Sequence, residues 1–208
     1  MEIPVEHGQL ETVLREPRGP IRAAAIVCHP HPLQGGTMHT KAVYRVAQAL
    51  TELGVAACRF NFRGVGRSTG TYGGGVGEKD DATEALDWLG ERYPGVPLVA
   101  GGFSFGSMVA LKVGSTDSRV SSLIGFGVPV HLYDYGFLEA IEKPTLLIQG
   151  SQDEFGTAQE LEKTTGSFGP KITVATVVGA DHYFNGKIDQ LKQAVSDYYN
   201  KGDGGKIL

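Results

Sequence analysis

Apolar residues recur along the chain in two alternating patterns. Short, continuously apolar segments are typical of strands buried on both faces of a sheet, whereas apolar residues that return every three or four positions indicate helices with one buried face. The first pattern predicts strands at residues 21–28, 55–62, 96–100, 120–126, 145–149 and 172–178. The second pattern predicts helices at residues 41–53, 78–93, 105–113, 157–168 and 187–199.

The alternation of strands and helices predicts an α/β fold, with a mostly parallel central sheet and helices on both of its faces. Residues 2–16 carry Gly8-Gln9 between two strand-like pieces, which predicts an antiparallel hairpin at the sheet edge. No linker divides the chain, so we expect one domain over residues 1–208, with a frayed tail at residues 202–208. Ligands of such sheets bind beyond the carboxyl ends of the strands, so the loops that follow the strands are expected to carry the functional residues.

Composition narrows the class of protein further. The 208 residues contain 30 glycines, roughly twice the usual share. Nineteen basic and 23 acidic residues give a net charge of −4 without a basic block, which argues against a nucleic-acid partner. The N-terminus has no signal-peptide pattern and no apolar run could cross a membrane, so we expect a cytoplasmic protein. Cys28 and Cys58 lie in apolar, strand-like runs and are expected to be buried free thiols.

A catalytic motif follows the strand predicted at residues 96–100. Gly102-Phe103-Ser104-Phe105-Gly106 matches the Gly-x-Ser-x-Gly nucleophile elbow, in the strand-to-helix context that this motif requires. The glycines leave space in a sharp turn that holds the serine hydroxyl above the sheet. The backbone N–H of Phe105, at the start of the next helix, is then a candidate oxyanion donor. A glycine-rich turn with a capping serine is the alternative interpretation.

A serine nucleophile needs a base to remove its proton and an acid to orient that base. In sheets with a nucleophile elbow, the acid and then the histidine follow the serine along the chain. Here Asp153 follows the strand at 145–149, and His182 follows the strand at 172–178. We therefore predict a catalytic triad of Ser104, Asp153 and His182. Three other acids are alternatives: Glu154 beside Asp153, Asp134 after the strand at 120–126, and Asp181, which adjoins His182 and is interpreted as a turn residue.

Two further stretches carry a resemblance to a known family. With the elbow, residues 29–38 (HPHPLQGGTM) and 59–68 (RFNFRGVGRS) resemble the α/β-hydrolase superfamily, and in particular small lidless bacterial hydrolases related to dienelactone hydrolases and serine esterases. The resemblance implies that the second stretch braces the site and that the first supplies a second oxyanion donor, the backbone N–H of His31. Leu33 is the nearby alternative, because proline has no N–H. Dienelactone hydrolases carry cysteine at the elbow, so Ser104 favours an ordinary ester.

We therefore expect a serine esterase that cleaves small carboxylic esters through an acyl-enzyme intermediate, with no metal or organic cofactor and a small-molecule ester as its partner. Only residues 127–143 separate two successive strands, which is too short for a lid and predicts an open cleft. The alternatives are a thioesterase, an amidase or peptidase of the same fold, or a non-catalytic binding protein of that fold. The expected substrate contacts are Leu33, Phe103, Tyr133 and Phe184.

Three other patterns bear on cofactors. His29 and His31 lack a nearby acidic or cysteine ligand, which disfavours a metal site. Residues 64–70 approach a dinucleotide-binding fingerprint, but the next helix is expected only from residue 78, whereas that fingerprint opens directly into a helix. We interpret the remaining glycines, at residues 70–77, as a mobile flap beside the site. The other histidines, interpreted as surface or packing residues, are His7, His39 and His131.

Overall fold

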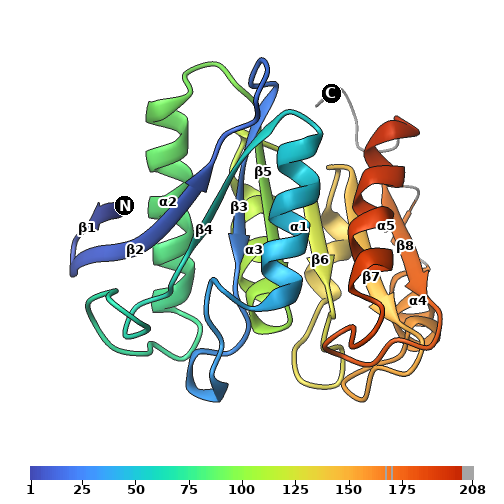
Figure 1. The fold of residues 1–208 in the computed structure, drawn as a ribbon. Helices are drawn as coiled ribbons and strands as arrows, with labels where there is room; N and C mark the ends of the chain where they lie inside the picture. Colours follow the sequence, from blue (N-terminus) through green and yellow to red (C-terminus); the bar gives the residue numbers. More distant parts are fainter. Residues whose placement is uncertain (167, 170, 203–208) are drawn as a thin grey trace.

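The computed structural model describes residues 1–166, 168–169 and 171–202. Within these residues, eight strands form one sheet in the order β1-β2-β4-β3-β5-β6-β7-β8 (Figure 1). β1 and β2 form an antiparallel hairpin at the edge, β2 is antiparallel to β4, and the other neighbours are parallel. This arrangement confirms the predicted fold class. Apart from Gly202, the predicted frayed tail lies outside the described residues.

The elements follow the predicted alternation. The strands are β1 (Glu2–Val5), β2 (Gly8–Arg15), β3 (Ala23–Cys28), β4 (Val55–Phe60), β5 (Leu98–Phe103), β6 (Val120–Phe126), β7 (Thr145–Gly150) and β8 (Ile172–Val177). The helices are α1 (Lys41–Glu52), α2 (Gly77–Arg92), α3 (Phe105–Thr116), α4 (Ala158–Thr165) and α5 (Ile188–Asn200), with short 3₁₀ helices η1 (Pro32–Gln34) and η2 (Gly136–Ala140).

The strand before the elbow, β5, extends three residues beyond its predicted end at residue 100. β5 runs on to Phe103, because Gly101 and Gly102 pair with Val27 and Cys28 of β3 at the centre of the sheet. Glycines there look like loop residues in the sequence. A Cβ on Gly102 would collide with the Gly106 carbonyl group, so the close approach of strand and helix requires glycine.

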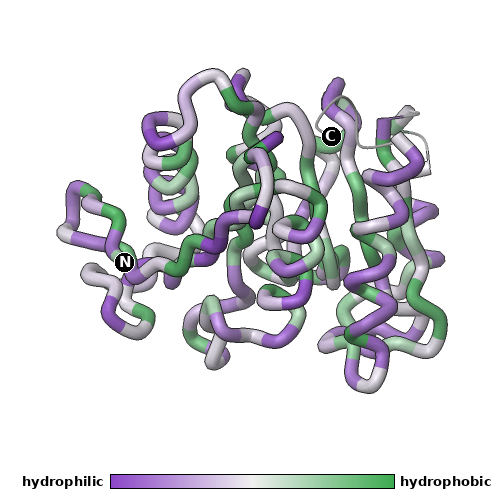
Figure 2. The backbone as a smooth tube through the Cα atoms, turned by 45° about the horizontal axis from the view of Figure 1, so that its top comes forward, coloured by the Kyte–Doolittle hydropathy of each residue, from purple (hydrophilic) through white to green (hydrophobic). Residues whose placement is uncertain are grey.

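Two apolar layers cover the sheet. α1 and α5 pack on one face, and α2, α3 and α4 pack on the other (Figure 1). Strands β3, β4 and β5 are buried along their whole length, and apart from Arg59 in β4 they contain no charged residue. Figure 2 shows green, hydrophobic stretches of backbone in the middle of the molecule. Cys28 and Cys58 are buried free thiols, as predicted, and burial raises the pKa of Cys58 to about 12.

The N-terminal hairpin holds the loop between β4 and α2. The backbone N–H of Gln9 donates to Thr69 Oγ1 (2.7 Å), and that of Glu11 donates to Ser68 Oγ (2.8 Å). Residues from β2 and from the loop, far apart in sequence, are thereby fixed against each other. This loop continues toward the rim of the sheet on which the site lies.

The loops that follow the parallel strands gather at one rim, along the lower edge of Figure 1. The connection from β6 to β7 contains only the short helix η2, so nothing from this segment forms a lid over the rim. Among the described residues, no helix has the length and apolar character needed to cross a lipid bilayer.

Candidate active site

Ser104 sits in a strained turn between β5 and α3. Its φ of 54° and ψ of −123° lie in a region that residues with a side chain rarely adopt. A Cβ on Gly102 would meet the Gly106 carbonyl group, and a Cβ on Gly106 would meet the carbonyl groups of Cys28 and His29. The two glycines of the motif therefore permit a turn that would otherwise be blocked on both sides, and the capping-serine alternative is wrong because the Ser104 side chain makes no capping hydrogen bond.

The structure brings the three residues of the predicted triad together. Ser104 Oγ lies 2.9 Å from His182 Nε2, and His182 Nδ1 lies 2.9 Å from Asp153 Oδ2. The side chains of His182 and Asp153 are 3% and 0% exposed. Because a carboxylate can only accept, Nδ1 donates its proton to Asp153 and Nε2 is left to accept the Ser104 hydroxyl proton. The arrangement is that of a serine activated by an oriented base.

Asp153 is held by donors that the sequence did not single out. Its Oδ2 also accepts from Gln149 Nε2 (2.9 Å), and its Oδ1 accepts from the backbone N–H of Phe155 (2.9 Å). Gln149 is fully buried in β7 and also bonds both backbone groups of Val128, on the loop after β6. A lone amide in an otherwise apolar strand, four residues before the acid, is the signal that could have identified it.

Phe103 and Phe184, predicted as substrate contacts, are instead packing residues. Both are fully buried, and neither lines the cleft at Ser104. Phe103 stacks on the His182 ring with centroids 5.0 Å apart, and its other neighbours include Phe126 and Phe184. Phe103, the last residue of β5, packs in the apolar layer that contains α1 and α5. Its ring therefore packs against the His182 ring within the core and does not face substrate.

The cleft beside Ser104 has a volume of about 320 Å³. Tyr133 lines it, as predicted, but Leu33, which lies on η1 and is 71% exposed, is not among the lining residues. Sequence reasoning missed several lining residues, because they come from separate loops with no shared motif. The lining consists of Pro30, His31, Gln34, Gly35, Gly36, Thr40, Ser104, Phe105, Leu132, Tyr133, Phe155, His182 and Tyr183.

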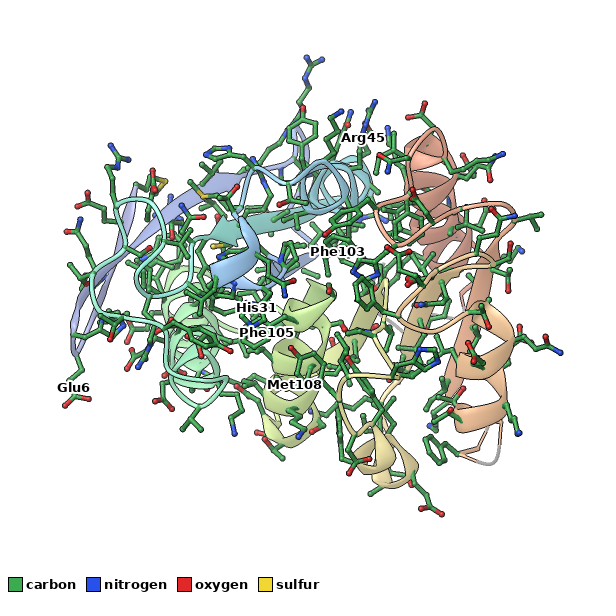
Figure 3. The ribbon with its side chains drawn as sticks, turned by 90° about the horizontal axis from the view of Figure 1, so that it is seen from below. Glu6, His31, Arg45, Phe103, Phe105 and Met108 are labelled. Carbon is green, nitrogen blue, oxygen red and sulfur yellow. The ribbon has the colours of Figure 1, made fainter. Side chains whose placement is uncertain are left out.

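Two residues that line the cleft together with Ser104 have backbone N–H groups available as donors. In the part of the chain that the structure describes, neither Phe105 N–H nor His31 N–H has a hydrogen-bond acceptor. The N–H of Leu33, the alternative donor, is occupied because it donates to His31 Nδ1 (3.2 Å). The rings of His31 and Phe105 lie 5.1 Å apart, and Figure 3 shows the two residues side by side. The geometry therefore favours the predicted pair over Leu33.

His29 shapes the loop after β3. Its Nε2 accepts from the backbone N–H of Phe62 (3.0 Å), so Nδ1 carries the proton that is donated to Pro30 O (2.6 Å). Burial lowers the pKa of His29 to about 4, which keeps the ring neutral at neutral pH. Both ring nitrogens are thus used within the protein. No three His, Cys, Asp or Glu side chains are grouped for metal binding within residues 1–166, 168–169 and 171–202.

The competing acids lie away from the His182 ring. Asp181 accepts from the backbone and side-chain nitrogens of Asn185, which fits its interpretation as a turn residue. Asp134 Oδ1 accepts from Gly136 N, and Glu154 Oε2 accepts from the backbone N–H of His182 rather than from its ring. The other histidines make no contact with the triad: His7 pairs with Asp81, and His131 pairs with Glu160.

A mostly parallel α/β sheet with a nucleophile elbow, and with Ser, Asp and His in loops at the ends of three strands, defines the α/β-hydrolase class. Comparison with known proteins agrees. Residues 24–197 match the family described as an alpha/beta hydrolase domain, and the chain belongs to that family.

Several relatives are similar over nearly the whole chain. An α/β serine hydrolase homologue from Coxiella burnetii is 36% identical, covers 95% of both chains and has a TM-score of 0.89. A serine hydrolase without a lid from Xanthomonas campestris is 30% identical, with 97% of this chain and 93% of that chain covered and a TM-score of 0.89. An uncharacterised protein of Rickettsia prowazekii is 34% identical over 92% of this chain and 84% of its own length.

Proposed function

We propose that the protein is a serine hydrolase that cleaves small carboxylic esters through Ser104, His182 and Asp153. The observation that carries this proposal is the continuous hydrogen-bonded chain from Ser104 Oγ through the His182 ring to a buried carboxylate, with 2.9 Å at each link. Relatives with 36% and 30% identity are described as a serine hydrolase homologue and a serine hydrolase, which supports the same chemistry.

The reaction runs in two halves. Ser104 Oγ attacks the ester carbonyl carbon while His182 Nε2 takes the hydroxyl proton, and Asp153 stabilises the imidazolium that forms. The tetrahedral intermediate collapses, the bond to the leaving alcohol breaks, and His182 gives that alcohol its proton. Water, deprotonated by His182, then attacks the acyl group on Ser104, and the carboxylic acid leaves as the serine regains its proton.

Negative charge develops on the carbonyl oxygen in both halves. The backbone N–H groups of Phe105 and His31 are the donors that we assign to it. Neither has a competing acceptor within the described residues, and Phe105 begins α3, whose N-terminus favours negative charge. Donors held ready before the reaction stabilise the transition state without reorganisation, so this oxyanion hole supplies a large share of the rate.

The cleft favours small and uncharged substrates. Its volume of about 320 Å³ lies at the lower end of ligand sites, and its lining contains no Asp, Glu, Lys or Arg. Aromatic side chains of Phe105, Tyr133, Phe155 and Tyr183 form much of the wall. A short acyl chain or a small aromatic acyl group fits this space and chemistry, whereas a long lipid chain would extend into solvent.

The nucleophile can be tested by covalent labelling. Treatment with a fluorophosphonate and peptide mass spectrometry should locate one adduct on Ser104 in the wild type and none in Ser104→Ala. Ser115→Ala is the matched control, because Ser115 lies on α3, the helix that follows Ser104, and its hydroxyl donates to the backbone of Lys112. Absence of an adduct on Ser104 in folded wild-type protein would favour a non-catalytic binding protein instead.

The substrate class needs a separate measurement. Hydrolysis of p-nitrophenyl esters with two to sixteen acyl carbons should be fastest for the short chains. A thioester and an anilide of the preferred acyl group, assayed in parallel, should be cleaved more slowly than the ester. Fastest turnover of the longest chains would contradict the small-substrate proposal, and faster turnover of the thioester or anilide would reassign the protein to that reaction.

A further inference from the structure

The glycine-rich segment at residues 70–77 is anchored rather than free. The Glu78 carboxylate is fully buried, and it accepts hydrogen bonds from the backbone N–H groups of Gly73 (2.8 Å) and Gly75 (2.7 Å). At the other end, Thr69 is bonded to the hairpin through Gln9. These contacts argue against the interpretation of this segment as a mobile flap. Its fixed course raises the question of what it holds in place.

The segment presents Tyr72 to the side chain of His31. Tyr72 Oη lies 3.1 Å from His31 Nε2, and the two ring centroids are 5.1 Å apart. Because His31 Nδ1 accepts from the Leu33 N–H, the ring proton is on Nε2, which donates it to the Tyr72 hydroxyl oxygen. The Phe105 ring also lies 5.1 Å from His31. The His31 side chain is thus held by Leu33, Tyr72 and Phe105 together.

The same residue supplies one of the two backbone N–H groups that we assign to the oxyanion, and it lines the cleft together with Ser104. An oxyanion donor is effective only when its N–H is within about 2.7–3.1 Å of the developing charge. The loop carrying His31 is fixed on its other side by His29, whose ring accepts from the Phe62 N–H. With His29 and His31 both tied through their rings, the peptide group between Pro30 and His31 has little freedom to rotate.

We propose that Tyr72 is a positioning residue of the oxyanion hole, which acts by holding the His31 side chain and thereby aiming the His31 N–H. This proposal rests on the proposed serine hydrolase function. It assigns the glycine-rich segment a role: its left-handed turns at Gly70, Gly74 and Gly75 bring Tyr72 back to the rim. Tyr72 is absent from the lining of the cleft, so its effect on the reaction passes through His31.

The test is Tyr72→Phe, which removes the hydroxyl and keeps the ring. We expect kcat and kcat/KM to fall together by about tenfold, with KM changed less than twofold, because the lost interaction matters only in the transition state. Tyr93→Phe is the matched control, because it also removes a hydrogen-bonded hydroxyl. Tyr93 lies at the C-terminal end of α2, and its hydroxyl donates to Glu16. This control should keep the wild-type kcat.

A double-mutant cycle separates positioning from a general loss of structure. His31→Ala keeps the backbone N–H but removes the ring, and adding Tyr72→Phe to it should cost no further kcat. An unchanged kcat in Tyr72→Phe would overturn the proposal. So would a rise in KM alone, which would make Tyr72 a substrate contact, or a full additional loss in the double variant. Failure of the function itself is distinguishable, because wild-type protein would then take no fluorophosphonate on Ser104.

Discussion

Two sides of Ser104 are built differently. On one side, His182, Asp153 and Gln149 are joined side chain to side chain in a buried line of hydrogen bonds. On the other side, His29 and His31 use their rings mainly to hold backbone groups and loops. The first side positions the proton acceptor, His182 Nε2, and the second side positions the backbone N–H of His31. Side-chain chemistry can be recognised from residue types, whereas backbone placement depends on contacts between distant loops.

The largest effect should come from breaking the line on the triad side. Asp153→Asn retains the size of the side chain but removes the carboxylate that selects the His182 tautomer, and we expect kcat to fall by about 10⁴-fold. Steady-state kinetics on the best ester, with circular dichroism to verify folding, measures it. Asp181→Asn is the matched control, because Asp181 adjoins His182 in sequence yet bonds Asn185. A large loss of kcat in Asp181→Asn together with little loss in Asp153→Asn would show that Asp181, and not Asp153, orients His182.

A smaller effect should follow from removing the support behind the acid. Gln149→Ala takes one donor from Asp153 and leaves the buried Val128 N–H without its acceptor. We expect the free energy of unfolding to fall by about 3 kcal/mol and kcat to fall roughly tenfold. Urea denaturation and kinetics measure the two quantities. Gln193→Ala, which removes an exposed amide on α5, should change neither. Equal free energies of unfolding for the two variants would show that the Gln149 side chain does not stabilise the fold.

On the other side of Ser104, the expected effect is on stability and depends on pH. His29 has its pKa lowered from 6.5 to about 4, so the unfolded chain binds a proton between these values that the folded protein does not. The free energy of unfolding should therefore fall as the pH is lowered from about 6.5 to about 4, by up to about 3 kcal/mol from this residue, and its contribution should be constant above that window.

Urea denaturation at pH 7, 5.5 and 4.5 measures this dependence, and comparison of variants isolates it from the other groups that titrate. His29→Gln should show a shallower loss of stability across the window than the wild type. His39→Gln, which replaces an exposed histidine on the same loop, should keep the wild-type slope. Identical slopes in all three proteins would mean that folding does not lower the pKa of His29, and would contradict this prediction.

The sequence was sufficient for the order of elements and for the residues on the triad side. Gly-x-Ser-x-Gly is a local motif with a steric cause, and Asp153 and His182 follow strands that apolar runs make visible. The sequence was not sufficient to predict whether an aromatic side chain faces the cleft or the core. Phe103 precedes Ser104 and Phe184 lies two residues after His182, but the pleat of β5 and the left-handed backbone at Phe184 direct their rings into the core.

The contact between Tyr72 and His31 shows a second limit. It joins residues 41 positions apart, in two loops whose course depends on buried anchors, namely Glu78 on one and His29 on the other. The composition reveals an excess of glycine, but it does not show that the glycine-rich turns at residues 70–77 place Tyr72 against His31. Such a pairing becomes visible only when the loops are placed in space, because neither tyrosine nor histidine belongs there to a motif with fixed spacing.

The crowding around Gly106 determines where this site can be redesigned. Backbone from the end of β3 lies where any side chain on Gly106 would go, so directed evolution that randomises the elbow would yield mostly misfolded variants. Exposed side chains on the rim of the cleft have no such restriction, and Leu132 and Tyr183 are 57% and 49% exposed. Libraries that seek a new acyl preference should therefore place their diversity at these positions and at Gln34, and leave the elbow unchanged.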